Sequence, residues 1–460
     1  MYRFLALIFL LTGIASAQET LLGSDFRRER ERFTENCADF KKLPGCAQVL
    51  FTDHPLHIAV GSIAPQNGFA AGLAFVAHKT PNESWRISLN SDAVASTNGS
   101  WRAGAYLKFV QTPPKSITVS HSDSGTTPTS NLQVSEYPVF NVYAQGISLN
   151  KLFYFGLGPA TSRSSQTVYG MTETIVGGNA IIPVLPKLKM SLVGEMNGRF
   201  FDIRGNHSQD MPSIEQLFSE ASAPGLTTHP GYLQFGEGIR IRSSLFSEHL
   251  RLNYLVNFQE FVAPSNSTFS FQRFTGDFNH EFPLYRTSGS SEPKQFNGPN
   301  ECSTAVGATC PKISASRNRE GAIGLRVLLS ESFVGSGHTV PFYLQPTLGG
   351  SDINGTPALP SYTDYRFRAP NVLLFRESIE HSIWGPLGFT ASADQGTLAL
   401  DNSDLAFQHF RHSYSTGFTV RAGGFPQIFL IFSWGGGEGT HTTANINTSL
   451  LGGSRRPSLF

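Results

Sequence analysis

The sequence predicts an all-β fold, a transmembrane antiparallel β-barrel of about 16 strands. Three observations predict it: a leader that sends the chain out of the cytoplasm, strand-length segments in which apolar and polar residues alternate, and enough chain to repeat that pattern many times. The 460 residues include 45 Gly and 37 Phe, and only 15% are charged. Abundant Phe and Gly with few charges are unusual in a soluble domain of this size and favour a barrel.

The alternation is clear in RLNYLVNFQEF, residues 251–261. Successive side chains of a β-strand point to opposite faces, so one face carries Leu252, Tyr254, Val256 and Phe258 while the other is mostly polar. In a soluble sandwich the apolar face would form the core. In a membrane barrel it would face lipid, and the polar face would line the lumen.

Repetition of this pattern along the chain favours the membrane alternative. In LKMSLVGEMNGRF, residues 188–200, apolar side chains alternate with polar ones that include Glu195, Asn197 and Arg199. Further predicted strands cover 85–90, 101–109, 137–149, 166–182, 231–242, 273–282, 319–331, 367–383, 385–396, 413–423, 425–434 and 441–451. Many exceed the usual five or six residues and suit the roughly 9–11 that cross a membrane at a tilt. Charges in mid-strand, with almost no helix between strands, indicate that the apolar face meets lipid.

The N-terminus supplies the export signal. Residues 1–17, MYRFLALIFLLTGIASA, contain an early arginine, a short apolar run and an Ala-Ser-Ala cleavage site, which together predict a secretory signal peptide. The apolar run is too short for a spanning helix of about 20 residues. We therefore predict three parts: the signal peptide at 1–17, a short and partly helical periplasmic segment at 18–55, and an outer-membrane barrel at 56–460.

The strand number follows from length. If each strand with its connection takes about 24 residues, the segment from residue 69 to residue 451 holds about 16 strands. Bacterial barrels have even numbers of strands, which agrees with 16. The tryptophans lie near predicted strand ends, as in interfacial girdles: Trp85, Trp101, Trp384 and Trp434.

Two connections are long enough to carry structure of their own. Residues 210–225 predict a loop helix, with Pro212 near its start and Gly225 after its end. Residues 284–318 predict a long polar insertion rich in Ser, Gly and Pro. The formal charge is only +1 and no basic block occurs, so we expect no nucleic-acid partner.

The four cysteines form two local pairs, Cys37 with Cys46 and Cys302 with Cys310. In an exported chain such short spacings predict two disulfide bonds. Metal binding by either pair would need further ligands, and neither pair has them nearby. The alternative to the two disulfide bonds is therefore four reduced thiols.

No catalytic constellation stands out, so we expect a non-enzymatic protein without a cofactor. The stretches GGSDINGT and GSGHT lack the Gly-x-Ser-x-Gly pattern of a nucleophile elbow. His54 and His57 have a spacing that could hold a metal on a turn, but no third ligand is near, and we expect no metal site.

The stretch from residue 341 to residue 396 resembles the bacterial surface antigen barrels of the BamA, TamA and FhaC superfamily. The shared order is a Leu-Gly-Gly strand end, a loop tip, an Arg-Phe-Arg segment and a strand that ends in Asp-x-Gly. These elements are Leu348-Gly349-Gly350, Ile353-Asn354-Gly355-Thr356, Arg366-Phe367-Arg368 and Asp394-Gln395-Gly396. The strong match covers about 60 residues, and FYFGLG at 153–158 resembles an early strand of the family.

The resemblance implies a barrel in the bacterial outer membrane, surrounded by its lipid, with a loop from about residue 344 to 365 folded into the lumen. Family members carry an arginine at the loop tip that pairs with the strand aspartate, whereas this chain has Asn354 there and Thr356 where an aromatic residue follows. We expect Arg366 or, more readily, Arg368 to reach Asp394 or its neighbours instead. The alternative is that both arginines line a wet lumen.

Two classes of function follow from the resemblance. The first is assembly or translocation of polypeptide or lipid, together with a separate periplasmic assembly or chaperone protein, since residues 18–55 are too short for the periplasmic POTRA domains of the family. The second is a passive pore or a structural surface barrel without assembly activity.

Overall fold

The computed structural model describes most of the chain after residue 55. The described ranges are 56–82, 84–111, 137–207, 211–247, 249–290, 316–384, 387–405, 410–422 and 425–446. The signal peptide, the 18–55 segment and all four cysteines lie outside them, so the predictions for these parts stay predictions.

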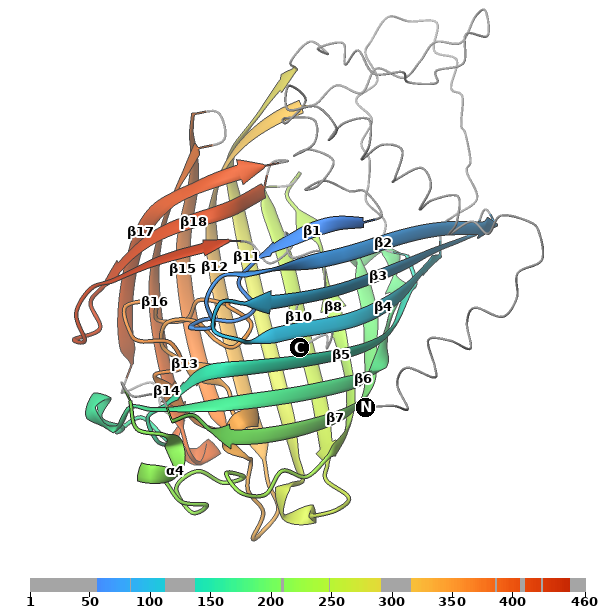
Figure 1. Ribbon diagram of the computed structural model, residues 1–460. Helices are drawn as coiled ribbons and strands as arrows, with labels where there is room; N and C mark the ends of the chain where they lie inside the picture. The colour runs from blue at the N-terminus through green and yellow to red at the C-terminus, as the bar shows by residue number, and fades with distance from the viewer. Residues whose placement is uncertain are drawn as a thin grey trace, which may run out of the picture.

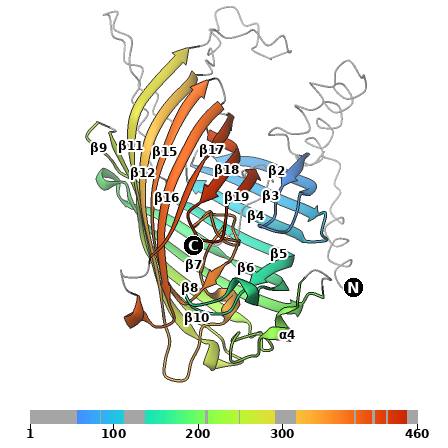
Figure 2. The ribbon, with the colours of Figure 1, turned by 90° about the vertical axis from the view of Figure 1, so that its left-hand side faces the viewer.

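One antiparallel sheet of 17 strands forms the fold, and its strands curve around a central space (Figures 1 and 2). The principal strands are β1 (Leu56–Gly61), β2 (Ala70–Asn82), β3 (Trp85–Ser96), β4 (Trp101–Gln111), β5 (Val139–Tyr154), β6 (Thr167–Leu185), β7 (Met190–Gly205), β8 (Tyr232–Ile241), β10 (Leu250–Val262), β11 (Phe271–Ser290), β12 (Ser316–Phe333), β15 (Asn371–Trp384), β16 (Leu387–Ala399), β17 (Arg411–Ala422), β18 (Phe425–Trp434) and β19 (His441–Ile446). The short β9 (Ser244–Leu245) pairs with the start of β10. Without β9, the described residues form sixteen strands of this sheet, in agreement with the prediction of about 16.

Each principal strand pairs with its neighbours in sequence, from β1–β2 to β18–β19. Within the described residues no backbone pairing joins β1 to β19, the two edges of the sheet. Residues of both edges nevertheless line one cavity, so the edges lie near each other. We call the border between β1 and β19 the seam.

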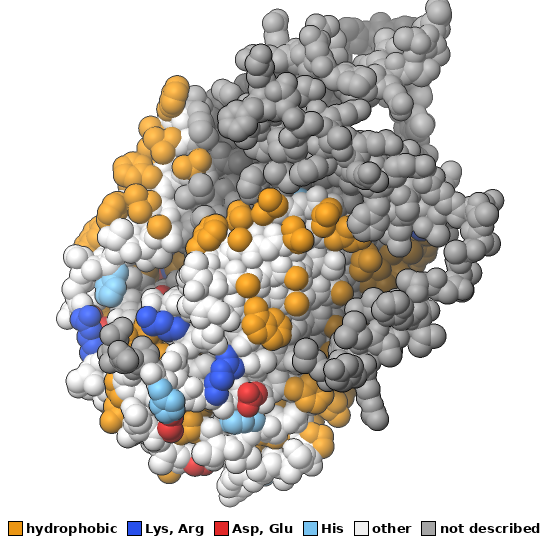
Figure 3. Space-filling view, viewed as in Figure 1, with side chains coloured by type: hydrophobic (Ala, Val, Ile, Leu, Met, Phe, Trp, Pro, Cys, Tyr) orange, Lys and Arg blue, Asp and Glu red, His pale blue; other side chains and the backbone are white. Residues whose placement is uncertain are grey.

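The two faces of the sheet differ as predicted. On β7, Glu195, Asn197 and Arg199 are buried, while Met196 is 62% and Phe200 58% exposed. The inner face is therefore polar and the outer face apolar. The outer surface in Figure 3 shows mostly hydrophobic side chains over the strands, and charged ones gather towards the lower end. An apolar outer face is stable against lipid rather than water, which identifies a membrane-spanning sheet.

Connections alternate between two ends of the sheet because the strands are antiparallel. Among the connections that are fully described, one end carries short turns such as 186–189, and we call it the turn end. The other carries longer loops, among them 155–166, 206–231 and 334–370, and we call it the loop end. Buried hydrophobic residues from these loops form a cluster that caps the sheet there, including Phe155, Ile214, Phe269, Phe342 and Tyr343.

Tryptophans mark both ends of the sheet. Trp85 and Trp384 lie at the turn end, whereas Trp101 and Trp434 lie at the loop end. Each begins or ends a strand, as the sequence predicts for interfacial girdles. An antiparallel sheet with an apolar outer face and aromatic residues at both ends is typical of a membrane-spanning barrel.

Three predicted boundaries need correction. The predicted helix at 210–225 is only the single turn α4 (Ile214–Leu217), because Phe218 turns to extended backbone and packs edge-on against Tyr154 at 4.8 Å. The polar insertion is shorter than predicted, since β11 and β12 continue to residues 290 and 316. The predicted strand at 367–383 is broken at Pro370, whose nitrogen cannot donate to a ladder. Among the described residues, no helix is both long and apolar enough to cross a membrane.

Candidate functional site

The long connection between β12 and β15 turns back toward the inner face of the sheet. Its ends form a small separate sheet, in which β13 (Thr347–Leu348) pairs with β14 (Phe367–Arg368). Residues of this connection line one cavity with inner-face residues of β10, β11 and β12. We call residues 344–368 the inward loop; Figure 2 shows the chain passing inside the curved sheet.

Two glycines let the inward loop fold back sharply. Gly349 and Gly350 have φ of +106° and +60°, backbone angles that residues other than glycine rarely adopt. A Cβ on Gly349 would overlap with Arg366 Cβ, so only glycine lets the backbones of the two arms of the loop lie this close together. The amide of Gly349 donates to the Ala358 carbonyl at 2.9 Å, and that of Tyr365 donates to the Gly349 carbonyl at 3.0 Å.

The tip of the loop is a tight turn organised by one carboxylate. Asp352 accepts hydrogen bonds from the amides of Asn354 and Thr356 at 2.9 and 2.7 Å. Gly355, with φ of +76°, completes the turn. The Asn354 side-chain oxygen is buried and has no hydrogen-bond partner among the described residues. The tip is therefore held from within, by Asp352, and the arginine of the resembled family is not needed for its shape.

Asp394 on β16 anchors the loop, but through different partners from those expected. Its buried carboxylate accepts the backbone N–H of Leu359 in the inward loop at 2.9 Å. The guanidinium of Arg376, directly opposite on β15, donates to the same carboxylate at 2.7 Å. Neither Arg366 nor Arg368 contacts Asp394, so that prediction is wrong. Arg376 is placed by strand register, whereas both expected arginines are bound elsewhere.

Gly396 makes room for the loop on the same strand face as Asp394. A Cβ there would lie 2.9 Å from the Leu348 side chain and 3.4 Å from that of Leu359. Leu348 and Leu359 are almost fully buried in a cluster with Phe367, Leu374 and Leu398. The Asp-x-Gly motif therefore contributes to loop binding in two ways. The aspartate accepts a hydrogen bond from the loop backbone, and the glycine, without a side chain, leaves space for the two leucines of the loop.

Arg366 ties the loop to two distant connections. Its Nε donates to the Glu438 carboxylate at 2.6 Å, and its Nη atoms donate to the hydroxyl and carbonyl of Thr161, both at 2.8 Å. Glu438 lies between β18 and β19, next to the seam, and Thr161 lies between β5 and β6. The Arg366 side chain is only 4% exposed, so the contact is far less screened by solvent than a surface ion pair.

The tip of the inward loop reaches the seam. A cavity of about 420 Å³ is lined by Gly61 and the following loop on one side, by Thr442–Ala444 of β19 on the other, and by Asn354 and Gly355 of the tip. Asp364 also lines this cavity and connects the inward loop to the β1–β2 loop. Its carboxylate accepts hydrogen bonds from the side-chain amide of Gln66 at 2.7 Å and from the backbone amide of Ser351 at 2.8 Å. Burial raises the pKa of Asp364 above its ordinary value.

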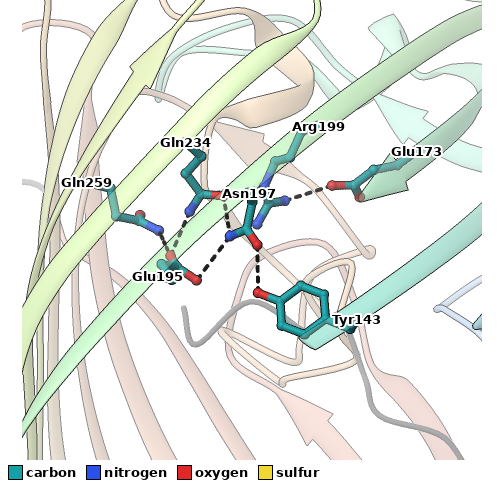
Figure 4. Close-up of polar contacts among 7 residues, drawn as sticks. All are labelled: Tyr143, Glu173, Glu195, Asn197, Arg199, Gln234 and Gln259. Carbon is teal, nitrogen blue, oxygen red and sulfur yellow. Dashed lines mark hydrogen bonds and ion pairs between the residues drawn. The ribbon is translucent and has the colours of Figure 1, made fainter. Parts of the chain in front are cut away.

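The inner wall opposite the seam is a polar network that spans five strands (Figure 4). Glu195 accepts from the side-chain amides of Gln234 and Gln259 at 2.7 and 2.8 Å. Arg199 donates to Glu173 at 2.7 Å, and Tyr143 donates to Asn197 at 2.6 Å. Buried charges with several partners are held in fixed positions, so this wall is a rigid support.

Sequence reasoning named the loop residues but missed their partners. Gly349, Gly350, Asn354, Gly355 and Asp394 do belong to one structure, the loop with its anchor. Arg376 could have been found by counting the register of the β15–β16 hairpin. Glu438, Thr161 and Gln66 lie in other loops, and no local signal marks them.

No family model matches the sequence, and no curated protein matches it. Among solved structures, CdiB from Acinetobacter baumannii is similar with 9% identity and a TM-score of 0.44, covering 85% of this chain and 56% of that one. BamA from Haemophilus ducreyi lacking POTRA domains 1–3 is 11% identical with a TM-score of 0.45, covering 85% and 68%. CdiB from Escherichia coli is 9% identical with a TM-score of 0.47, covering 86% and 60%.

The chain thus spans less than two thirds of the length of either CdiB chain. At these identities the likeness concerns the fold alone. The fold of this chain is similar to those of CdiB and BamA.

Proposed function

We propose that this chain is a non-enzymatic barrel that assembles or translocates polypeptide at the outer membrane, with the seam as the place where substrate engages. The observation that carries the proposal is the seam cavity, in which the tip of the inward loop lies between the two strand edges. Lipid is the alternative cargo.

The seam suits an extended polypeptide for a physical reason. A strand edge without a neighbour presents a row of backbone donors and acceptors, and an added strand can pair with it. Here β1 and β19 present two such edges, with no pairing between them in the described residues. A substrate strand that pairs with either edge would leave its apolar side chains toward lipid, where they are stable.

The inward loop gives the barrel a closed resting state. It is fixed to the wall by Asp394, to the β1–β2 loop by Asp364 and to the β18–β19 loop by Arg366. The contacts of Asp364 and Arg366 are made to loops that lie beside the seam. Opening of the seam would therefore strain the same contacts that hold the loop, so substrate entry and loop position are coupled.

The alternative function is a passive pore or structural surface barrel. The polar inner wall would suit a water-filled pore. The inward loop argues against it, because its leucines and aromatic residues fill the space beside β15 and β16. A separate periplasmic partner that delivers substrate is part of the proposal.

Cross-linking across the seam tests the proposal. In Ser62→Cys/Thr443→Cys, which places one thiol on each side of the seam cavity, a bismaleimide would join the edges. Proteoliposomes with the unlinked variant should accelerate folding of a urea-unfolded outer-membrane barrel protein, measured by protease resistance. The linked variant should not.

The matched control is Ser415→Cys/Ser433→Cys, whose positions are already opposite each other on β17 and β18. Linking them should leave the acceleration unchanged. Equal activity of the linked and unlinked seam variants would contradict the proposed entry site. Absence of acceleration by the unlinked protein would contradict polypeptide assembly itself.

A further inference from the structure

A second cavity lies behind the inward loop, away from the seam. Its volume is about 340 Å³, and it is bounded by the inward loop and by inner-face residues of β10, β11, β12 and β15. Small-molecule sites have volumes of roughly 300–1,000 Å³, so this space suits a compact ligand. Arg199 and Gln259, seen in Figure 4, belong to its wall.

The lining of this cavity is rich in guanidinium groups. Arg199, Arg273, Arg326 and Arg368 all contribute to it. Two of them are matched by carboxylates, since Arg199 pairs with Glu173 at 2.7 Å and Arg326 pairs with Asp277 at 2.9 Å. The other two, Arg273 and Arg368, have no carboxylate within ion-pair distance among the described residues.

Arg273 binds only neutral groups. Its Nη2 donates to the Leu344 carbonyl at 2.8 Å, and its Nε donates to the Ser332 hydroxyl at 3.2 Å. The guanidinium also lies over the rings of Phe261 and Phe271, 5.6 and 5.1 Å from their centroids. These contacts fix its direction but leave its charge without a counter-ion.

Arg368 is in the same situation on the other side of the 3-10 turn Phe342–Leu344. Its Nη1 donates to the Phe342 carbonyl at 2.6 Å, and Nη2 approaches the Tyr169 hydroxyl at 3.3 Å. The residue is 4% exposed, and its buried Nε has no acceptor in the described protein. A buried donor without a partner is costly, so a ligand that accepts from it would be strongly favoured.

One further carboxylate, that of Asp352, belongs to the lining. Asp352 lies at the loop tip, where its Oδ1 is occupied by the amides of Asn354 and Thr356. Four guanidinium groups are therefore offset by three carboxylates, Glu173, Asp277 and Asp352, which leaves an excess of one positive charge. The excess of positive charge is enclosed where solvent screens it weakly.

We propose that this cavity is a binding site for a tetrahedral oxyanion, a phosphate group, held between Arg273 and Arg368. The planar fork of each guanidinium matches the oxygens of a phosphate, and such charge-assisted bonds are stronger than neutral ones. The phosphate could belong to a soluble phosphate ester or to a lipid headgroup. Both arginines bind the turn that leads into the inward loop, so the anion would also brace that loop. The site does not depend on the proposed function.

The test is calorimetric titration of the purified full chain in detergent, at constant ionic strength set with chloride. Inorganic phosphate represents the free ligand, and dihexanoylphosphatidylglycerol below its micelle concentration represents the headgroup. We expect saturable binding of one molecule per chain. Arg273→Gln and Arg368→Gln should each weaken it about tenfold or more, because each removes a charge-assisted partner.

Arg204→Gln is the matched control. Arg204 also donates only to neutral oxygens, including those of Thr172, Ser148 and Asn150, but it does not line the cavity. Its substitution should leave the affinity unchanged. Equal weakening in the control, or no saturable binding of either probe, would overturn the proposal. Binding of the lipid probe alone would assign the site to headgroups, and binding of inorganic phosphate would assign it to soluble phosphate.

A direct observation covers the case in which the variants fail to fold. Crystals of the natural protein soaked in tungstate should show an anomalous peak between the guanidinium groups of Arg273 and Arg368. Tungstate peaks confined to other places would overturn the proposal without any substitution.

Discussion

Replacement of Asp394 by asparagine should release the inward loop. The buried carboxylate accepts the Leu359 amide at 2.9 Å and the Arg376 guanidinium at 2.7 Å. Asparagine fills the same volume but carries no charge, so both charge-assisted bonds are weakened and Arg376 remains buried without a counter-ion.

The magnitude follows from the bond to Leu359. A hydrogen bond to a charged group contributes about 1.5–3 kcal/mol. Because every 1.4 kcal/mol corresponds to about a tenfold change, losing it would raise the population with a released loop roughly 10- to 150-fold. Leu359 also has φ of +55°, a conformation unfavourable for leucine, which adds to the tendency to leave once the anchor is weakened.

The assay is the rate of proteolysis within residues 349–365 of the folded protein in detergent, where cleavage reports the released loop. Asp277→Asn is the control, because Asp277 forms a similar two-bond pair with Arg326 at 2.9 Å but, among the described residues, makes no hydrogen bond to the loop. The control should be cleaved at close to the natural rate. If both variants are cleaved at the same rate, or Asp394→Asn at the natural rate, the loop is not held through Asp394.

Three further predictions concern the membrane face, pH and the cysteines. Val256→Arg on the lipid face should lower the free energy of unfolding by about 2–4 kcal/mol, whereas Asn257→Arg on the lumen face should cost little; equal penalties in urea unfolding from lipid would refute the assignment of faces. Burial tends to raise the pKa of Glu220, but hydrogen bonds from Thr227 and Gly225 outweigh burial and lower the pKa below its ordinary value. The loop that contains Glu220 should therefore lose stability and become protease-sensitive as the pH falls through that pKa. The variant Glu220→Gln should show no such pH dependence. Mass mapping of unreduced peptides should find the two predicted local disulfides, and four free thiols would contradict them.

The alternation of residue types was sufficient to predict the sheet and its two faces. On β7 and β10 the side chains that alternate in the sequence lie on opposite faces, because a strand has a fixed period of two. The motif residues Asp394 and Gly396 could also be recognised, since their spacing puts both on the same face. These features depend only on the period of two along a single strand, which can be recognised directly in the order of residue types.

The partners of the motif residues could not be predicted in the same way. Arg366 seemed available for Asp394, but it binds Glu438 and Thr161, in loops far away along the chain. The pairing of Asp394 with Arg376 is the exception, because it follows from the register of the β15–β16 hairpin. Contacts between loops depend on how the whole sheet curves, and no single segment specifies that.

Conductance in planar lipid bilayers tests the central claim most directly, that the inward loop closes the barrel in its resting state. The natural protein should show small, fluctuating currents. A variant in which residues 350–364 are replaced by a short Gly-Ser linker should show large, steady ones, while the exposed turn 244–247 replaced in the same way should leave the small currents unchanged. Large steady conductance of the natural protein, unaltered by removal of the loop, would contradict a closed translocation barrel and identify a passive pore.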